Sequence, residues 1–255
     1  MKSDTIIIIA ARDSYSETWD AFFSLFFKYW PDCPYPVYLF TEKKTYPDPR
    51  ILPLVVSDDP NGSWGKQWAD RIRKALAEVD ASYFILLHTD YFFSEKIDTA
   101  RIAGLIELIR RSDVGYIRLC PVPPPKLPYS GDRTLGTLSK RDAYNVSLQA
   151  GLWKRSVFER FLISGLNPGE FEIEGSKNSY KVKETFLCTK KGLAAIPYVH
   201  GISKAAWLYE ARRFLKNEGH EVRTTRNKES FWAYICRVYY INMIKYRLKM
   251  LWCHL

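Results

Sequence analysis

The sequence predicts an α/β domain built on a mainly parallel sheet that helices flank. Short apolar runs rich in β-branched residues, such as residues 5–11, have the composition of strands buried on both faces. Amphipathic segments with helical spacing alternate with these runs, which is the pattern of strand–helix–strand units. The chain has 255 residues, of which 47% are hydrophobic, so it can form one large globular domain with a sizeable core.

The predicted elements follow one another through the first 120 residues. Strands are expected at residues 5–11, 37–40, 52–56, 83–87 and 115–119. The helix after the first strand carries aromatic residues at helical spacing from Trp19 onward, and Pro31 ends it. A second helix begins at Ser63, and a third follows the strand at 83–87.

The composition changes after Cys120. Residues 121–144 are rich in Pro, Gly and Ser, and a long loop of this kind in a compact domain is functional or disordered. Order returns with a strand or turn, a helix from about Lys154, and a last strand within residues 193–207. From residue 210 to 255 the chain is expected to be helical and basic, with ten Lys and Arg against four Glu.

The charge and the cysteines narrow the class of protein. The formal net charge of +10, from 38 Lys and Arg against 28 Asp and Glu, favours an anionic partner: nucleic acid, an acidic membrane surface or a phosphorylated substrate. The five cysteines form no CxxC pair, so neither a zinc site nor a disulfide framework is indicated, and an odd count fits a reducing compartment. The first apolar run is too short for a signal peptide, and no segment has the roughly 20 apolar residues of a transmembrane helix.

Polar residues follow two of the predicted strands. Arg12 and Asp13 come after the first strand, and His88 and Asp90 come after the strand at 83–87. Ligands of parallel sheets bind beyond the carboxyl ends of the strands, so both pairs lie at the edge where a ligand is expected. Asp90 is either a turn residue or a ligand residue. In the second case it would hold Mg²⁺ or Mn²⁺ on a diphosphate, with His88 assisting the softer Mn²⁺.

Three glutamates alternate in the stretch NPGEFEIEGS. On a strand, Glu170, Glu172 and Glu174 would share one face. They are either a solvated edge strand or the source of a general base that removes the proton of an acceptor hydroxyl. The chain lacks a Walker A loop, a G-x-G-x-x-G and a G-x-S-x-G, which argues against an NTPase, a dinucleotide enzyme and an α/β-hydrolase.

Taken in order, four stretches resemble the GT-A class of nucleotide-sugar glycosyltransferases, in particular small bacterial enzymes of cell-surface polysaccharide (capsule or lipopolysaccharide) synthesis. They are IIIIAARDSY with KYWPDCPYPVYLFT, then residues 63–93, then SLQAGLWKRSVFERFL, then NPGEFEIEGS. The resemblance implies a GT-A-like, Rossmann-like sheet. It also implies transfer of a sugar from a nucleotide sugar, with a UDP-sugar favoured, to a glycan or lipid-linked acceptor.

The resemblance also implies roles for individual residues. Those expected to bind the donor are Arg12, Asp13, Tyr15, Trp64, Gln67, Arg71 and Asp90. Those expected to line the sugar and acceptor cleft are Ser147, Gln149 and Trp153. His200 and Lys204 would close over the diphosphate, and Glu172 or Glu170 would be the base of an inverting reaction. The first acid of the family's D-x-D motif is His88 here, so whether a divalent cation is used depends on Asp90, His88 and phosphate oxygens.

The expected organisation is a transferase domain at 1–209, with a donor half at about 1–120 and an acceptor half at about 121–209, followed by a basic amphipathic tail at 210–255. In the tail, aromatic and aliphatic residues repeat at heptad-like spacing; they are Trp232, Ile235, Tyr239, Met243, Tyr246 and Met250. This stripe is either a core or homodimer helix or an interfacial helix on an anionic membrane. The second interpretation places a cytoplasmic protein at the inner face of the cytoplasmic membrane.

Two alternatives to a glycosyltransferase remain. The loss of the first D-x-D acid leaves open a non-catalytic glycan- or nucleotide-binding protein of the same fold. The basic composition leaves open a nucleic-acid-binding protein, although no recognisable motif of that class accompanies it and no nucleic acid is expected as partner.

Overall fold

The first apolar run forms β1 (Thr5–Ala10), in which all six residues are buried. It pairs in parallel with β2 (Val37–Thr41) on one side and with β4 (Tyr83–His88) on the other. β3 (Ile51–Val55) extends the sheet in parallel beyond β2. The resulting order β3-β2-β1-β4 is that of one half of a Rossmann-type sheet, in which the strand order reverses beside β1.

The other half of the nine-stranded sheet is mixed. β9 (Gly151–Lys154) lies antiparallel between β4 and β6 (Val114–Arg118). β10 (Thr185–Thr189) runs parallel to β6. Two short antiparallel strands, β8 (Leu135–Thr137) and β7 (Leu127–Pro128), complete the edge, so the long loop predicted at 121–144 contains two strands.

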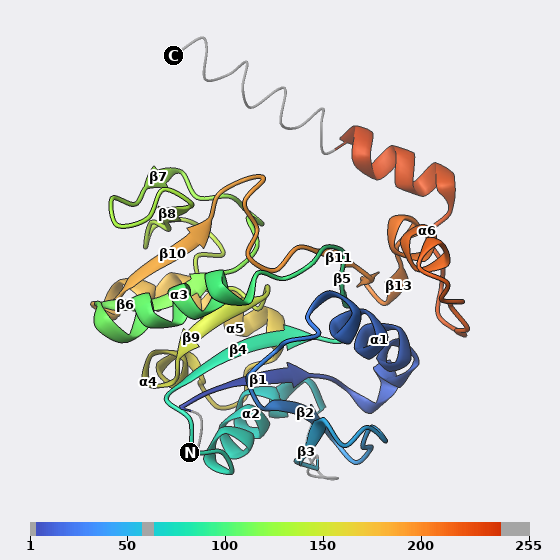
Figure 1. The fold of residues 1–255 in the computed structure, drawn as a ribbon, viewed down its shortest axis with the longest axis horizontal. Helices are drawn as coiled ribbons and strands as arrows, with labels where there is room; N and C mark the ends of the chain where they lie inside the picture. Colours follow the sequence, from blue (N-terminus) through green and yellow to red (C-terminus); the bar gives the residue numbers. More distant parts are fainter. Residues whose placement is uncertain (1–3, 58–63, 241–255) are drawn as a thin grey trace. The chain divides into compact units, whose positions relative to one another are not determined.

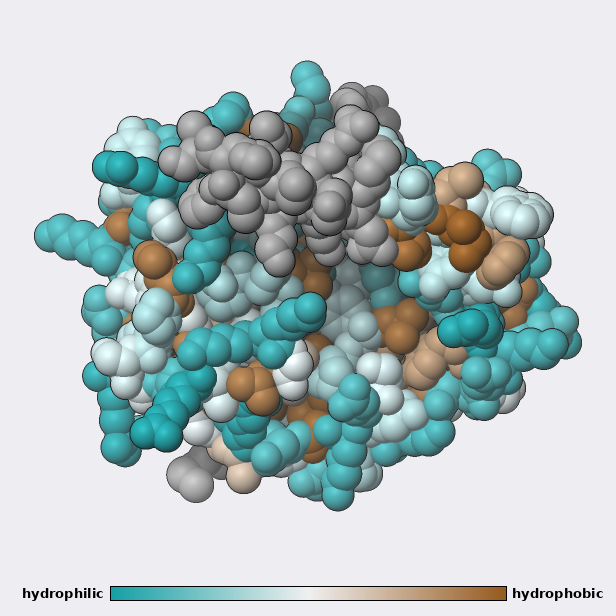
Figure 2. All heavy atoms as spheres, turned by 90° about the horizontal axis from the view of Figure 1, so that it is seen from above, coloured by the Kyte–Doolittle hydropathy of each residue, from teal (hydrophilic) through white to brown (hydrophobic). Residues whose placement is uncertain are grey.

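This computed structural model describes residues 4–57 and 64–240. Contacts divide the chain into two units, Met1–Tyr198 and Val199–Leu255, which are described separately below. The α/β prediction, a mainly parallel sheet flanked by helices, is confirmed for the first unit. In Figure 2, which shows one face of the molecule, hydrophilic side chains surround separate groups of hydrophobic ones.

Helices cover both faces of the sheet (Figure 1). One layer contains α1 (Trp19–Tyr29) and α3 (Thr99–Arg111). The other contains α2 (Trp68–Ala77), α4 (Arg155–Phe158) and α5 (Pro168–Asn178). Alternate residues of β1 face this second layer, where Ile6, Ile8 and Ala10 share a buried cluster with residues of all three helices.

The described part of the first unit also contains four short 3-10 helices, one of which leads directly into α2. They are η1 (Asp13–Thr18), η3 (Glu159–Phe161), η4 (Ser179–Lys181) and η2 (Trp64–Gln67). The helix predicted from Ser63 therefore starts as a 3-10 turn, and its α-helical part begins at Trp68; Ser63 itself lies outside the described residues. As predicted, α1 ends before Pro31, and the indole of Trp30 donates to Thr99 Oγ1 at 2.9 Å.

The three alternating glutamates lie on the helix α5, so the solvated edge strand that was one alternative for this stretch is wrong. Asn167 caps α5: its Oδ1 accepts the backbone N–H of Glu170 at 2.9 Å, and the Glu170 carboxylate accepts the backbone N–H of Asn167 at 2.9 Å. Pro168 occupies the first turn, where its missing N–H costs nothing. On a helix residue i+2 points away from residues i and i+4, so Glu172 lies on a different side of α5 from Glu170 and Glu174, and the three carboxylates do not form one face.

The second unit contains short strands and two helical segments. β11 (Tyr198–His200) starts on the last residue of the first unit, and β12 (Ile202–Ser203) pairs with β13 (Ala206–Trp207). α6 (Tyr209–Asn217) follows, and residues 231–240 are helical. Residues 218–230 are not helical, so the continuous helix expected from residue 210 is wrong in this part, and residues 241–255 lie outside the described chain. None of the described helices is long and apolar enough to cross a bilayer.

Candidate functional site at the carboxyl edge of the sheet

The parallel strands bring polar side chains to one edge of the sheet. Arg12 follows β1, Glu42 follows β2, Asp90 follows β4 and Cys120 follows β6. These strands run in the same direction or are linked through β9, so their carboxyl ends meet at the same edge. This is the edge at which ligands of open α/β sheets bind.

Glu42 organises the donor-side loop. Its carboxylate is buried, with 6% of the residue exposed, and accepts from Arg12 Nε at 3.0 Å and from Arg71 Nη1 at 3.2 Å. Arg71 also donates through Nε to the carbonyl oxygen of Val56 at 2.9 Å, and only 5% of it is exposed. Arg71, predicted to contact phosphate, is therefore held inside the fold. Arg12 lies nearer the surface, with about a third of its side chain exposed.

The other predicted donor residues are placed as follows. Asp13 accepts the backbone N–H of Lys44 at 3.3 Å, and its own N–H donates to Glu42, so two loops are joined at this point. Tyr15 is half-buried in η1, where its N–H donates to the carbonyl of Arg12 at 2.8 Å. Gln67 is half-buried at the end of η2, and the side chain of Trp64 lies outside the described part.

An aromatic and polar cluster surrounds Asp90. Tyr91, in β5 (Tyr91–Phe93), stacks on Tyr198 with ring centroids 4.4 Å apart, and the His88 ring meets Tyr91 edge-on at 5.2 Å. The Tyr198 hydroxyl donates to Gln149 Oε1. Burial first, and then neighbouring groups that include Asp90, raise the pKa of both tyrosines well above the ordinary value. Both hydroxyls are therefore neutral hydrogen-bond donors at physiological pH.

The segment 147–149 is fixed from both sides. Glu172 Oε1 accepts the Ser147 hydroxyl at 2.9 Å and the backbone N–H of Leu148 at 2.7 Å. The Tyr116 hydroxyl donates to the carbonyl of Ser147 at 3.2 Å, and the Tyr91 hydroxyl to that of Leu148 at 3.4 Å. The structure thus brings together Ser147 and Glu172, and it joins Gln149 to the cluster around Asp90.

Only one of the three glutamates of α5 reaches this segment. Glu170 is exposed and serves in the capping box, and Glu174 pairs with Lys177 at 2.7 Å. Glu172 is half-buried, and its Oε1 accepts both hydrogen bonds from the segment 147–149. Within the described residues, its Oε2 accepts no side-chain or backbone hydrogen bond. The geometry therefore separates Glu172 from the alternative base, Glu170.

Trp153 lies in the hydrophobic core. It is 0% exposed in β9 and stacks on Tyr116, with ring centroids 3.8 Å apart and planes 16° from parallel. Phe158 and Phe186 pack against its edges. Trp153 is thus a core residue and does not line a sugar cleft, contrary to the expectation from the sequence.

The donor atoms for a divalent cation are few. Among the described residues, no group of three or more His, Cys, Asp or Glu side chains is arranged to hold a metal ion. Asp90 and His88 are separated by Thr89 in the turn after β4. One carboxylate and one imidazole do not make a complete site, so a cation here would need the phosphate oxygens of a ligand as further donors.

His200 and Lys204 belong to the second unit. His200 ends β11 and is exposed, and Lys204 has a left-handed backbone conformation with φ of 49° in the β12–β13 turn. Their approach to a bound diphosphate stays a prediction.

Sequence reasoning missed three members of the edge: Glu42, Tyr91 and Tyr198. The strand predicted at 37–40 extends to Thr41, and Glu42 follows it directly. Glu42 is therefore a polar residue after a strand, which is the criterion that identified Arg12 and Asp90. Tyr91 and Tyr198 meet only in the folded chain, because 106 residues separate them, and no sequence pattern pairs them.

Comparison with known proteins gives a likeness of fold. No protein-family model matches the chain, and no curated protein matches it. Among solved structures, S. aureus TarS (residues 1–349) is 14% identical with a TM-score of 0.47, covering 78% of this chain and 59% of that one. The mannosyltransferase PcManGT from Pyrobaculum calidifontis, in complex with GDP-Man and Mn²⁺, is 11% identical with a TM-score of 0.43, covering 72% and 54%.

A third similar structure is a cytidylyltransferase from Leptospira borgpetersenii serovar Hardjo-bovis. It is 12% identical with a TM-score of 0.42, and the match covers 76% of this chain and 79% of that one. The chain thus spans little more than half the length of the TarS and mannosyltransferase chains.

Proposed function

We propose that the chain is a glycosyltransferase that moves a sugar from a nucleotide-sugar donor to the hydroxyl of a glycan or lipid-linked acceptor. The observation that carries the proposal is the position of Glu172. Its carboxylate is anchored through Oε1 on the segment 147–149, at the carboxyl edge of a sheet with the strand order 3-2-1-4. A base fixed at a ligand-binding edge is what activation of an acceptor hydroxyl needs.

The proposed reaction is a single displacement at the anomeric carbon. The acceptor oxygen forms a bond to that carbon, the bond from the carbon to the phosphate oxygen breaks, and the nucleoside diphosphate leaves with the bonding pair. Glu172 takes the proton of the acceptor hydroxyl. Because the acceptor attacks the face opposite the leaving diphosphate, the configuration at the anomeric carbon is inverted. Gln149 and Tyr198, held by their mutual hydrogen bond, present fixed polar groups that can select sugar hydroxyls.

Negative charge develops on the leaving diphosphate. Arg12 is the partly exposed cation of the donor loop, and Glu42 fixes its direction. Asp90 and His88 would hold a divalent cation together with the diphosphate, and the cation would supply further charge stabilisation.

Donor binding tests the first step. In a thermal-shift screen of UDP-, GDP-, CMP- and dTDP-sugars, one donor, with a UDP-sugar favoured, is expected to raise the melting temperature. A ligand at 100 times its Kd adds about 2.7 kcal/mol to the free energy of unfolding. The screen is repeated with Mn²⁺ and with EDTA, and a shift that needs Mn²⁺ assigns a cation to Asp90 and His88.

Two controls separate the alternatives. Donor binding without hydrolysis or transfer in any acceptor extract would indicate a non-catalytic binding protein. A chain that ignores every nucleotide sugar but binds an oligonucleotide with steep salt dependence would be a nucleic-acid-binding protein, and the proposal would fail.

The tail is proposed to bind an anionic membrane surface. On the described part of its helix, Trp232 is 74% and Tyr239 is 69% exposed. Arg237, a cation of this helix, pairs with Glu229 and Glu210, at 2.8 Å each. Lys245, Arg247 and Lys249 of the tail lie outside the described residues, so aromatic insertion is the part of the proposal that the described residues support.

Replacing Trp232 and Tyr239 with Ser is expected to weaken binding to phosphatidylglycerol-containing vesicles about tenfold or more, because two exposed aromatic rings lose their insertion energy. The measurement is vesicle co-sedimentation, with Ile163→Ser as an exposed hydrophobic control in the first unit. Deleting residues 229–255 should release the protein as well. Unchanged binding combined with a change from dimer to monomer in light scattering would make the stripe a dimer surface.

A further inference from the structure

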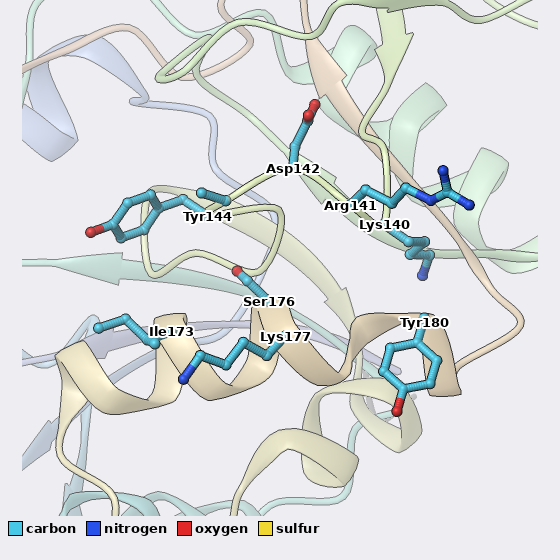
Figure 3. A pocket seen from close by; sticks show the side chains of 9 residues that line it. Lys140, Arg141, Asp142, Tyr144, Ile173, Ser176, Lys177 and Tyr180 are labelled. Atoms are coloured by element: carbon cyan, nitrogen blue, oxygen red, sulfur yellow. The ribbon is translucent and has the colours of Figure 1, made fainter.

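A pocket of about 760 Å³ lies between α5 and the segment 140–144. This volume is within the range of small-molecule sites. In Figure 3, Lys140, Arg141 and Asp142 lie over α5, while Ile173, Ser176 and Lys177 project from the helix. The walls therefore come from two segments, and the hydrogen bond from the Ser179 hydroxyl to the carbonyl of Lys140, at 3.2 Å, joins them.

The pocket adjoins the proposed base. Ser176 follows Glu172 by four residues and so lies one turn further along the same side of α5. Its hydroxyl accepts the backbone N–H of Val146 at 3.1 Å, directly before the segment that Glu172 holds. A molecule in the pocket would thus be next to the residue proposed to activate the acceptor.

The charge of the walls is positive. Three cationic residues, Lys140, Arg141 and Lys177, line the pocket against one carboxylate, Asp142. Asp142 accepts Lys126 Nζ at 2.9 Å, and Lys177 pairs with Glu174 at 2.7 Å, so the positive charge of the lining comes from Lys140 and Arg141. The lining therefore favours a ligand with negative charge.

Lys140 has the environment of a binding residue. Its Nζ is buried and has no hydrogen-bond partner among the described residues, and it lies 3.3 Å from the centroid of the Phe186 ring. Burial lowers the pKa of this ammonium group to about 8, against a smaller opposing effect of Glu184. A cation kept where burial disfavours its charge is typical of a functional position.

The rim carries exposed aromatic rings. Tyr144 has φ of 57°, a left-handed conformation that bulky residues rarely adopt, and the fully buried Arg118 donates to its carbonyl. Tyr180 is 68% exposed at the other end of the pocket. Backbone strain of this kind persists where the surroundings impose it and concentrates at binding sites.

We propose that this pocket binds the acceptor through an anionic group, a carboxylate or a phosphate carried by a sugar, with Tyr144 and Tyr180 against the sugar rings. The assignment of the ligand as acceptor rests on the proposed glycosyltransferase function. The binding of an anionic sugar does not rest on that function, because it is measured without a donor and without turnover.

The test uses matched probes on the full chain. By NMR titration or calorimetry, tetragalacturonate is compared with its neutral methyl ester, and glucose 1-phosphate with glucose. At least one anion is expected to bind about tenfold or more tightly than its neutral partner, and which one does so distinguishes a carboxylate from a phosphate. If neither anion binds, or if the neutral forms bind equally well, the proposal is overturned.

Variants locate the binding. Arg141→Gln and Lys140→Met are each expected to reduce anion affinity about tenfold, whereas Lys183→Gln, an exposed lysine outside the lining, leaves it within twofold. Lys140→Met should melt no lower than the wild type, because burial disfavours the charge that it removes. Equal loss in the Lys183 variant, or no loss in the other two, would overturn the proposal.

Glu172→Gln separates this proposal from the proposed function. The Gln variant should bind the anionic probe as the wild type does, since Glu172 does not line the pocket. If the wild type transfers sugar but does not bind the anionic probe, the pocket proposal alone fails. If the wild type binds the anionic probe but transfers no sugar, the proposed function fails and the pocket proposal stands; loss of transfer in the Gln variant alone is the result expected of the base.

Discussion

Glu172→Gln is expected to lower the rate of sugar transfer by about 10²–10⁴-fold while leaving donor affinity within twofold. The amide oxygen of Gln can still accept the Ser147 hydroxyl and the Leu148 N–H, which are 2.9 and 2.7 Å from Glu172 Oε1. The substitution thus keeps the segment 147–149 in place and removes only the capacity to take a proton. Measurement requires single-turnover transfer rates and a donor titration on the same preparation.

Two other variants make this result specific. Glu170→Gln changes a carboxylate two residues away, and Gln is equally suited to the capping box, so transfer and stability should stay close to wild type. Glu172→Ala removes both hydrogen bonds as well, and it is expected to lower the free energy of unfolding by about 1–3 kcal/mol. Wild-type turnover in Glu172→Gln would reduce Glu172 to a residue that only positions the segment.

The first half of the fold was predictable because its signals are local. A strand buried on both faces is apolar throughout, and β1 shows this pattern over its full length. The helix α1 repeats aromatic residues at helical spacing and stops before Pro31. Each of these features is set by residues within a few positions, so the sequence alone contains it.

The second half depends on pairing between distant segments. β9 inserts antiparallel between β4 and β6, and the alternation of strands and helices gives no hint of that order. α5 is a different case: Asn167, Pro168 and Glu170 form a recognisable helix start, but the alternating glutamates favoured a strand. Local capping chemistry decided the structure, because two reciprocal hydrogen bonds hold the first turn.

The candidate site was predictable as a set of strand ends and less so as a set of contacts. Arg12 and Asp90 lie at the predicted edge because a parallel sheet places them there. The burial of Arg71 and Trp153 could not be read from sequence, since Trp and Arg side chains occupy clefts and cores alike. The partners of Arg71 follow β2 and β3, and the rings around Trp153 come from β6, α4 and β10, so their surroundings form only in the folded chain.

Glu42→Ala is expected to lower the free energy of unfolding by about 3–5 kcal/mol, because it removes the carboxylate from a buried ion pair with Arg71. Donor affinity should fall too, since Arg12 loses the bond that directs it. Urea denaturation and donor titration measure the two effects. The matched control is Glu107→Ala, whose partly exposed carboxylate pairs with Arg110 and Arg111, and this variant should change stability by less than about 1 kcal/mol.

Glu42→Gln distinguishes the charge of this group from its shape. The amide keeps an oxygen that can accept from Arg12 Nε and Arg71 Nη1, which lie 3.0 and 3.2 Å from the carboxylate, but it no longer neutralises two cations. Glu42→Gln is therefore expected to lower the free energy of unfolding by an amount between those of Glu42→Ala and Glu107→Ala. If Glu42→Ala and Glu107→Ala unfold at the same urea concentration, the ion pairs around Glu42 do not hold the donor loop. The direction of Arg12 would then have to come from the bonds that the Asp13 carboxylate accepts from the backbone N–H groups of Lys43 and Lys44.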